Sequence, residues 1–510
     1  MASQIHQQLH FLLVPLMSQS HLIQFIDMAK LLVHRGLIVT IVVTPLNAVR
    51  FEKTITHSKT SNLQIQFLSL RFPCEEFGLP QGCENMDTLP SLDLAPKFFE
   101  ASNMLEEPLD KWLQQTHNSL PLPSCIVADF CLPWTANIAQ KFNIPRVIFH
   151  AISCFTLVCS QKITSSNIVL DSLMSDSEPF LVPNIPDRIE FTKAQLPETT
   201  RLSSKKQTST TTDDLEGLID QFKEAELSAQ GILVNTFEEL EPRYVKEYQK
   251  MVKKLWCIGP CSMSKQATSS GNKASMEGKD CYFLKWLEPW KPRSVVYVCF
   301  GSLCKMSASQ LKELALGLEA SNRPFIWVIR KGDDSEELEK WFTEANYEER
   351  VKERGRIIRG WAPQVSILSH PATGGFLTHC GWNSTLEGIS AGLPMITWPM
   401  FAEQFYNDKL IVQVLKTGVG VGVKECVPLG VTDHDQKDNK VMVKREEIKK
   451  AIDEVMDEGE EGEERRKRAW KLGEMAKRTV EEGGSSYLKM TLFIQHVIGQ
   501  VGSNHSNLCK

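Results

Sequence analysis

The chain has 510 residues, of which 42% are hydrophobic and 23% are charged, and it carries a formal net charge of -5. A chain of this length exceeds one ordinary hydrophobic core and predicts two domains, and its composition argues against wholesale disorder. Because the charge is slightly negative and no basic stripe carries interleaved aromatic residues, the sequence argues against a nucleic-acid-binding protein.

The sequence offers no signal for a membrane or an extracellular location. No run of about 18 apolar residues occurs, which argues against a membrane-spanning helix. The apolar run at residues 11–17 is too short for a signal peptide with its cleavage site. The 14 cysteines are scattered without metal-type spacing, which is typical of reduced, mostly buried thiols. We therefore expect a cytoplasmic protein that acts as a monomer.

Strand and helix patterns alternate from the start of the chain. Residues 10–16 (HFLLVPL) predict a strand, and the polar residues Ser18–Ser20 supply N-cap candidates for a following helix. Apolar residues then recur at helical spacing up to Gly36, a residue type that commonly ends helices. Residues 37–43 (LIVTIVV) are almost continuously apolar, as expected of a parallel strand buried on both faces. Strand, helix and strand together form the unit of a doubly wound α/β domain.

The same alternation returns further along the chain. Residues 124–128 and 146–149 predict strands on either side of a helix at 134–141. Between Cys261 and Lys279 a run rich in Ser, Gly and Lys predicts a linker. A second series of strands is predicted after the linker, at residues 294–300, 325–329, 356–359, 375–378 and 395–398. The sequence thus predicts an α/β protein with two Rossmann-like domains facing each other across a cleft.

Two charged segments have ordinary explanations. Residues 444–477 are helical in pattern and rich in both signs of charge, which favours a solvated helix face. Asp433-His434-Asp435 is a D-x-D sequence that could hold a divalent metal. Because it lies in a polar, loop-like stretch without a preceding strand, we expect no metal site there.

The most informative stretch is residues 361–404, WAPQVSILSHPATGGFLTHCGWNSTLEGISAGLPMITWPMFAEQ. A glycine-rich strand leads through a turn into a helix, and Asn383 and Ser384 place amide and hydroxyl groups at the helix N-terminus. Unpaired N–H groups and the helix dipole at that position favour an anion such as a pyrophosphate. His379, just before the turn, can donate to the same phosphate.

Two further side chains of this stretch suit a nucleoside. Glu387 lies one turn beyond Asn383 and can accept hydrogen bonds from both hydroxyls of a ribose. Trp361 can stack on a planar base. Each of these residues alone has an ordinary alternative, such as a core tryptophan or a plain glycine turn. Their order and spacing together favour a nucleotide-sugar site.

Residues 361–404 resemble the signature box of the plant family-1 UDP-glycosyltransferases, in the W-A-P-Q opening, the H-C-G-W-N-S-x-x-E centre and the closing E-Q. The resemblance extends over essentially the whole chain. It implies a GT-B fold with an acceptor-binding domain at 1–258, a linker at 259–280, a donor-binding domain at 281–482, and at 483–510 a helix crossing back to the first domain with a polar tail. It also implies UDP-glucose as donor substrate, with no cofactor and no metal.

The resemblance also assigns donor-binding roles. It implies that Trp361 stacks on uracil, with Ala362 and Gln364 beside the base and ribose, and that Glu387 holds the ribose hydroxyls. It implies that the phosphates are held by His379, Asn383, Ser384, Gly301 and Ser302. It implies that the sugar hydroxyls are contacted by Trp382, Glu403 and Gln404. A closing glutamine such as Gln404 goes with glucose in this family.

Position along the chain singles out a catalytic pair. His21 follows the first predicted strand and Asp129 ends the strand 124–128, so both fall at the carboxyl edge of the first predicted sheet. A histidine is the usual general base near neutral pH, and a carboxylate on its far nitrogen fixes the tautomer. We expect the helix N-terminus to hold His21 neutral. The resemblance assigns His21 as base and Asp129 as its partner, although Ser20 and Gln24 stand where relatives commonly carry Gly and Pro.

The acceptor is predicted to be a small lipophilic molecule. Its pocket is expected among apolar residues of the N-terminal half: Met17, Phe77, Leu79, Met86, Leu89, Phe130, Phe149, Phe155 and Leu196. The chain most resembles the branch of the family that acts on triterpenoids, steroids, flavonoids and cytokinins, so a triterpenoid or steroid-like aglycone is the first expectation and a flavonoid the second. Two other classes remain open: an epimerase or hydrolase of the same fold, and a non-catalytic UDP-sugar-binding protein. The latter has no use for the pair His21 and Asp129.

Overall fold

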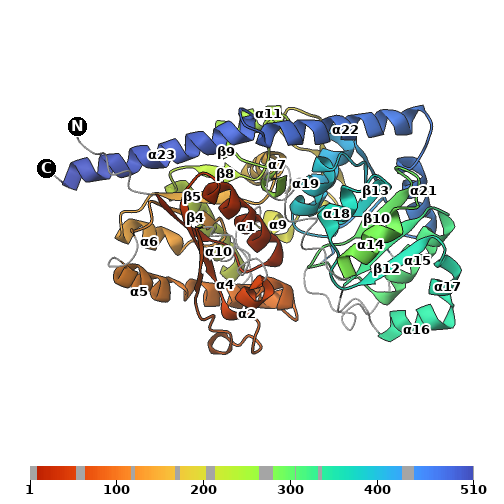
Figure 1. Cartoon of the computed structure of the whole chain (residues 1–510), viewed down its shortest axis with the longest axis horizontal. Helices are drawn as coiled ribbons and strands as arrows, with labels where there is room; N and C mark the ends of the chain where they lie inside the picture. Colours follow the sequence, from red (N-terminus) through yellow and green to blue (C-terminus); the bar gives the residue numbers. More distant parts are fainter. Residues whose placement is uncertain are drawn as a thin grey trace.

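The computed structural model describes residues 9–52, 64–116, 121–166, 170, 173–202, 213–263, 279–304, 306–330, 336–427 and 442–508. Two parallel β-sheets organise these residues, one from each half of the chain (Figure 1). The α/β fold class predicted from the sequence is confirmed. We refer to the two parts as the first half and the second half.

The first half is built on a seven-stranded parallel sheet in the order β3-β2-β1-β4-β5-β8-β9. Its strands are β1 (His10–Val14), β2 (Ile38–Val43), β3 (Ile65–Ser69), β4 (Cys125–Asp129), β5 (Arg146–His150), β8 (Ile232–Val234) and β9 (Leu255–Cys257). Every residue of the four central strands β2, β1, β4 and β5 is buried, which explains their unbroken apolar runs. The strand order reverses between β1 and β4, and ligand sites of α/β sheets lie at such a point.

The second half repeats this plan with six parallel strands in the order β12-β11-β10-β13-β14-β15. They are β10 (Val295–Cys299), β11 (Phe325–Ile329), β12 (Gly355–Arg359), β13 (Thr373–Thr378), β14 (Met395–Thr397) and β15 (Gly418–Gly420). The order reverses between β10 and β13. A small antiparallel pair, β6 (Pro179–Leu181) and β7 (Glu190–Thr192), belongs to neither sheet.

Helices alternate with the strands. The first half contains α1 (Gln19–Val33), α2 (Pro45–Arg50), α4 (Ala95–Asn103), α5 (Glu106–Thr116), α6 (Thr135–Lys141), α7 (Cys154–Ser165), α9 (Glu198–Leu202), α10 (Asp213–Ser228) and α11 (Pro242–Gln249). The second half contains α14 (Lys279–Leu287), α15 (Ala308–Ala320), α16 (Glu336–Glu344), α17 (Tyr347–Val351), α18 (Gln364–Leu368), α19 (Trp382–Ser390), α20 (Gln404–Lys409) and α21 (Arg445–Val455). None of the helices in the described ranges is long and apolar enough to cross a membrane.

The last two helices run along both halves (Figure 1). Helix α22 (Glu460–Val480) packs on α19 of the second half, and α23 (Ser485–Leu508) packs on β9 of the first. The Phe493 ring of α23 lies 5.7 Å from Phe11 and 5.3 Å from Trp256, centroid to centroid. The chain therefore returns to the first half after completing the second.

Candidate active site

His21 and Asp129 meet at the carboxyl edge of the first sheet. His21 is the third residue of α1, which follows β1, and Asp129 is the last residue of the adjacent strand β4. The His21 Nδ1 atom lies 2.6 Å from Asp129 Oδ2. The Asp129 side chain is buried, while 21% of the His21 side chain is exposed. The carboxylate thus holds one ring nitrogen of an imidazole that remains partly accessible.

The electrostatics of His21 differ from the expectation. Burial by itself lowers the pKa of His21, but the Asp129 carboxylate, helped by Glu403 and Asp87 at longer range, raises it above its ordinary value. The expectation that the helix N-terminus lowers this pKa is therefore outweighed by a carboxylate in direct contact, whose effect on the His21 pKa is the opposite. A raised pKa makes the imidazole a stronger base toward a hydroxyl proton.

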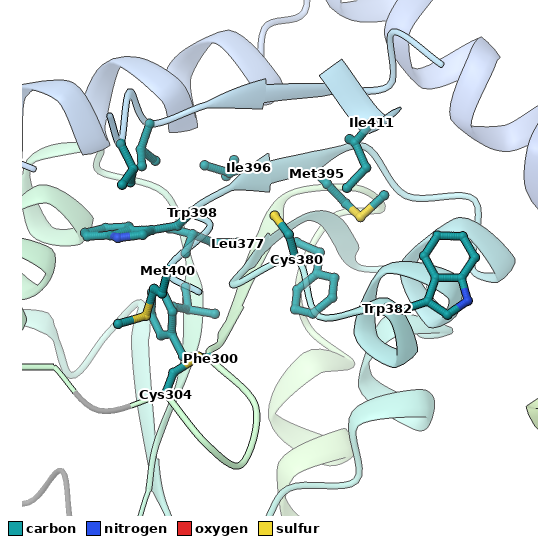
Figure 2. Packing of buried hydrophobic residues seen from close by; sticks show 14 of the residues in the cluster. Phe300, Cys304, Leu377, Cys380, Trp382, Met395, Ile396, Trp398, Met400 and Ile411 are labelled. Carbon is teal, nitrogen blue, oxygen red and sulfur yellow. The ribbon is translucent and has the colours of Figure 1, made fainter. Parts of the chain in front are cut away.

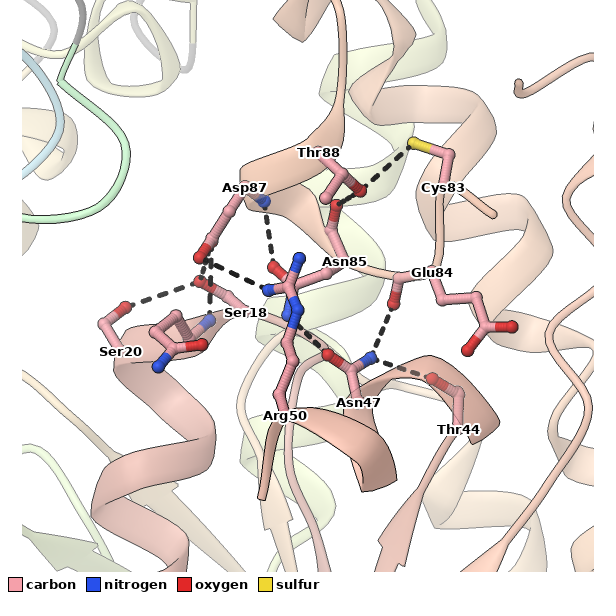
Figure 3. Close-up of polar contacts among 11 residues, drawn as sticks. Ser18, Ser20, Thr44, Asn47, Arg50, Cys83, Glu84, Asn85, Asp87 and Thr88 are labelled. Atoms are coloured by element: carbon pink, nitrogen blue, oxygen red, sulfur yellow. Dashed lines mark hydrogen bonds and ion pairs between the residues drawn. The ribbon is translucent and has the colours of Figure 1, made fainter. Parts of the chain in front are cut away.

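Asp87 forms hydrogen bonds with the N-terminal end of α1, the helix that carries His21 (Figure 3). Its Oδ1 accepts hydrogen bonds from the Ser18 hydroxyl at 3.3 Å and from the Gln19 N–H at 3.4 Å, at the start of α1. The Ser18 side chain does not itself cap the helix, so Asp87 supplies that cap from another part of the chain. The Ser20 hydroxyl lies 3.4 Å from the Ser18 hydroxyl. Ser20, which stands where relatives commonly carry glycine, therefore belongs to the same hydrogen-bond network.

A strained turn joins β13 to α19 in the second half. Cys380 has a φ of 67°, in the left-handed region that residues other than glycine rarely occupy. The Asn407 amide donates to the Cys380 carbonyl at 2.9 Å, and the Thr378 hydroxyl accepts from its N–H at 3.3 Å. Figure 2 shows this turn lying against a packed apolar cluster, which holds the strained conformation in place.

The His379 ring is enclosed by two glycines. A Cβ atom added at Gly301 would lie 2.5 Å from the ring, and one added at Gly381 would lie 2.4 Å from it. Burial, helped by the nearby Arg330 cation, lowers the pKa of His379 to about 4. The imidazole is therefore neutral at pH 7. It can donate an N–H to a phosphate, which is the role expected from the sequence.

The residues predicted for ribose and phosphate form one hydrogen-bonded group. The Gln364 amide donates to Glu387 at 2.7 Å and to the Ser384 hydroxyl at 3.2 Å. The Asn383 amide donates to the other Glu387 oxygen at 3.2 Å. Burial raises the pKa of Glu387 to about 7, although the Gln364 bond opposes this. The second turn of α19 thus carries a partly buried carboxyl group oriented by two amides.

The Trp382 side chain contacts the first half of the molecule. Its indole is only 1% exposed, and the indole N–H donates to the main-chain oxygen of Asn235 in the first half at 2.8 Å. The Trp382 backbone N–H donates to Glu403 at 3.0 Å. The indole is therefore committed to the contact between the two halves, because a buried indole needs a partner for its N–H. Only the backbone of Trp382 borders the group predicted to bind the sugar.

The two ends of the Gln404 side-chain amide have different surroundings. Its oxygen accepts from the Met400 and Phe401 N–H groups at 2.8 and 3.2 Å, while its nitrogen lies 3.9 Å from the Cys304 sulfur. The oxygen thus caps a turn, and the N–H₂ group carries the remaining donor capacity.

The other residues predicted to bind the donor follow strands of the second sheet, β12 and β10. The Trp361 side chain is 70% exposed, as a stacking platform requires, and Ala362 is buried beside it. Ser302 follows Gly301 in the turn after β10. The alternative metal sequence Asp433–Asp435 lies outside the described residues.

Three residues of this region were missed from the sequence. Arg330 directly follows β11 and donates to the Cys304 carbonyl at 3.2 Å, and its charge acts on both His379 and Asp87. Its position after a strand at the carboxyl edge of the second sheet is a signal that could have found it. Asn235 also follows a strand, β8, but this three-residue strand shows no clear pattern in the sequence. Asp87 follows no strand, and both residues acquire their roles through contacts with distant elements.

The residues predicted to line the acceptor pocket divide into two groups. Phe77, Met86 and Phe130 are partly buried. Phe149 and Phe155 are fully buried and make edge-on contacts with Phe25 and Tyr244 in the core. Met17, Leu79, Leu89 and Leu196 are also buried.

Comparison with known proteins agrees with this geometry. Residues 223–433 match the family model described as UDP-glucoronosyl and UDP-glucosyl transferase. The chain is 48% identical over 500 residues to UDP-glycosyltransferase 73C3 of Arabidopsis thaliana, covering 97% of each chain. It resembles the crystal structure of Glycyrrhiza uralensis UGT73P12 complexed with glycyrrhetinic acid 3-O-monoglucuronide, with a TM-score of 0.84, 34% identity and coverage of 98% of each chain.

A second solved structure, Phytolacca americana UGT2 complexed with UDP-2fluoro-glucose and pterostilbene, matches with a TM-score of 0.72 and 26% identity, covering 96% of this chain and 99% of that one. The agreement in sequence extends over nearly the whole chain, and the agreement in fold includes both sheets. Together with the donor box, these findings identify the chain as a UDP-glycosyltransferase enzyme with the GT-B fold. The chain belongs to the plant family-1 UDP-glycosyltransferases.

Proposed function

We propose that the protein transfers glucose from UDP-glucose to a hydroxyl group of a small lipophilic plant metabolite, with inversion at the anomeric carbon. The observation that carries this proposal is the pair formed by His21 and Asp129 at 2.6 Å, on the edge of the first sheet. Glu403 of the second half is close enough for its charge to act on His21. The base and the predicted sugar-binding residues therefore border the same place.

The chemistry follows from these groups. His21 takes the proton of the acceptor hydroxyl while the acceptor oxygen forms a bond to the anomeric carbon and the bond from that carbon to the UDP oxygen breaks. Asp129 stabilises the imidazolium that results. Attack opposite the leaving group converts an α-linked donor into a β-glucoside, and UDP leaves with the electron pair.

The leaving diphosphate meets donors and positive charge supplied by the protein. The N-terminus of α19 and the Ser384 hydroxyl offer donors, and the neutral His379 can add one N–H. Arg330, whose charge reaches His379, is the cation of this group. We propose on this basis that transfer needs no metal and no cofactor.

The donor sugar is assigned from the closing pair of the box. The Gln404 N–H₂ group and the Glu403 carboxyl can pair with neighbouring equatorial hydroxyls. Galactose places its 4-hydroxyl axially and leaves such buried groups unmatched. Glucose is therefore the proposed sugar.

The acceptor is assigned more narrowly than the family alone allows. The solved structure with the TM-score of 0.84 holds a glycyrrhetinic acid glucuronide, and this supports a triterpenoid or steroid-like aglycone for the present chain. The second solved structure holds pterostilbene, which supports a flavonoid or other phenolic acceptor as the alternative. We propose that residues 1–258 bind the acceptor and that residues 281–482 bind the donor. Residues 259–280 would then form the linker between these domains, and residues 483–510 would return to the first domain. We further propose that the protein acts as a cytoplasmic monomer.

The test is direct. The protein is incubated with UDP-glucose and a panel of triterpenoid, steroid, flavonoid and cytokinin aglycones, and products are identified by mass and by the anomeric proton coupling. A β-glucoside of a triterpenoid or steroid is the expected product. Free glucose without any glucoside would point to a hydrolase, and UDP binding without turnover to a binding protein. An α-glucoside would overturn the inverting mechanism.

A further inference from the structure

Asn235 joins three separate parts of the chain. It directly follows β8 and is 2% exposed. Its side-chain oxygen accepts from the Cys261 N–H at 3.0 Å, and its side-chain nitrogen donates to the Gln24 side-chain oxygen at 2.6 Å. Its main-chain oxygen accepts from the Trp382 indole N–H at 2.8 Å. One buried residue thus contacts helix α1, helix α19 and the segment that follows β9.

The two helices joined in this way carry the two sides of the reaction. Gln24 lies one turn beyond His21 in α1, and Trp382 is the first residue of α19, directly before Asn383 and Ser384. Gln24 is 3% exposed and Trp382 is 1% exposed, so water cannot replace either partner. The chain of bonds therefore runs from the base helix to the donor helix across the contact between the two halves.

The packing around Asn235 leaves it no room to move. A Cβ atom added at Gly259 would lie 2.4 Å from the Asn235 side-chain oxygen and 2.7 Å from its main-chain carbon. The segment after β9 therefore fits against Asn235 only because residue 259 is a glycine.

Gln24 is a residue at which this chain departs from the pattern of the family that it resembles. Proline, which is common at this position in the family that the chain resembles, has no side-chain oxygen to accept the Asn235 N–H. The bond between Gln24 and Asn235 therefore depends on the residue that departs from the family pattern.

We propose that Gln24, Asn235 and Trp382 act as positioning residues that fix the donor helix relative to the base. The inference rests on the proposed role of His21 as the base. Reaction rates depend steeply on the placement of reacting groups, and a misplacement of about 1 Å from a distant change can cost about a hundredfold. The bond chain holds that placement between two halves that come from separate parts of the sequence.

The central experiment compares Gln24→Leu with Gln24→Glu. Gln24→Leu keeps the side-chain volume but leaves the Asn235 N–H₂ group without its acceptor, and kcat should fall about tenfold, because an unpaired buried donor strains the contact it belongs to. KM for UDP-glucose and the UDP dissociation constant should stay within about twofold, since the donor box is untouched. Gln24→Glu keeps an acceptor oxygen and should retain kcat within about threefold. Equal kcat in Gln24→Leu and the wild type would overturn the proposal.

A double-mutant cycle tests whether the bonds act as one unit. Trp382→Phe replaces the indole with a smaller aromatic ring that lacks the N–H, and its loss of kcat should not multiply with that of Gln24→Leu. Independent, multiplying effects would show that the two bonds do not share one positioning role and would overturn it.

Gln310 provides a matched control. It is also buried, its amide nitrogen donates to the Val443 carbonyl at 2.7 Å, and its oxygen accepts from the Met442 and Val443 N–H groups, all inside the second half. Gln310→Leu should lower the Tm at least as much as Gln24→Leu but leave kcat within about twofold. A kcat loss in Gln310→Leu equal to that in Gln24→Leu would reduce the effect to general destabilisation and overturn the proposal.

Hydrogen exchange separates this inference from the proposed function, because it needs no acceptor. Backbone amides of α19 should exchange faster in Gln24→Leu than in the wild type, although residue 24 lies in the other half, and not in Gln24→Glu. Unchanged exchange in α19 would overturn the inference even if the enzyme is active. Absence of any glucoside from the wild type would instead overturn the proposed function and leave this measurement valid.

Discussion

Two histidines lie at the carboxyl edges of the two sheets, and their surroundings give them opposite properties. His21 in the first half contacts a buried carboxylate at 2.6 Å, and its pKa is raised. His379 in the second half is enclosed by glycines near a guanidinium group, and its pKa falls to about 4. The same side chain in the same part of a repeated architecture therefore has a raised pKa in one half, where we propose that it is the base, and a lowered pKa in the other.

This difference shows that the partner, more than the position in the fold, determines the role. Both residues are subject to burial, which disfavours the charged imidazole in each case. Asp129 reverses that effect at His21, whereas Arg330 reinforces it at His379. In the proposed mechanism the proton therefore moves on the acceptor side of the reaction, while the donor side offers fixed hydrogen-bond donors to the leaving group.

Removing the base is the strongest test of the comparison. His21→Ala should lower kcat about a thousandfold or more, because loss of a general base costs about 10²–10⁴. UDP binding measured by calorimetry should stay near the wild-type value. His34→Ala, at the exposed end of the same helix, is the matched control and should turn over normally. Near-normal turnover in His21→Ala would remove this residue from the mechanism.

Removing the partner charge tests why the two histidines differ. Asp129→Asn keeps the imidazole and should cost about ten- to a hundredfold in kcat, the range for one hydrogen bond to a charged group. The carboxylate raises the pKa of His21, so its loss lets that pKa fall. The acid limb of the kcat/KM profile, where activity rises as His21 loses its proton, should therefore move to lower pH. An unchanged acid limb would separate Asp129 from the base.

The same pair predicts how stability depends on pH. Because the pKa of His21 is raised in the folded protein, its contribution to stability is fully present below the unfolded value of 6.5 and is lost as pH rises through the folded value. The stability difference between the wild type and His21→Gln should shrink over that interval in urea titrations. A difference that grows with rising pH would contradict the sign of this shift.

Donor choice tests the sugar end of the second half. Leaving one buried polar group unpaired costs about 1–3 kcal/mol, so UDP-glucose should be preferred over UDP-galactose about ten- to a hundredfold. The preference should shrink in Gln404→His. The measurement is a competition of both donors at equal concentration with one accepted aglycone. Equal use of the two sugars by the wild type would leave the glucose assignment without support.

A milder change tests the donor-side histidine. His379→Gln replaces one neutral donor with another, and kcat/KM should fall less than about tenfold, the range for a neutral hydrogen bond. The pH profile between pH 5 and 8 should keep its shape, because a group with a pKa of about 4 does not titrate there. A shifted acid limb in this variant would show that His379 is protonated during turnover.

The smallest effect is expected from metal removal. Excess EDTA should leave activity within about twofold, because the helix N-terminus of α19 and Arg330 meet the charge of the diphosphate. Activity that is lost to EDTA and restored by Mn²⁺ would contradict this prediction and support metal binding by Asp433–Asp435.

Much of the architecture could be read from the sequence, because its signals are local. The strand predicted at 325–329 coincides with β11. The strand predicted at 37–43 begins one residue before β2, and the strand predicted at 124–128 begins and ends one residue before β4. Such strands are buried on both faces and appear as continuous apolar runs. The strands β3, β8, β9 and β15 were not predicted. β3 is only partly buried, and the other three have three residues each, so none of them shows a long apolar run.

The sequence by itself determined the family, the donor box and the pair of His21 and Asp129, because the box is contiguous and strand order places both ends of the pair at one edge. Only the tertiary structure decided that Asp129 raises the pKa of His21, that Trp382 turns its indole toward Asn235, and that His379 is neutral. These properties depend on burial and on partners far away in the chain. Local patterns cannot encode them, since electrostatic and hydrogen-bond energies depend on distance in space.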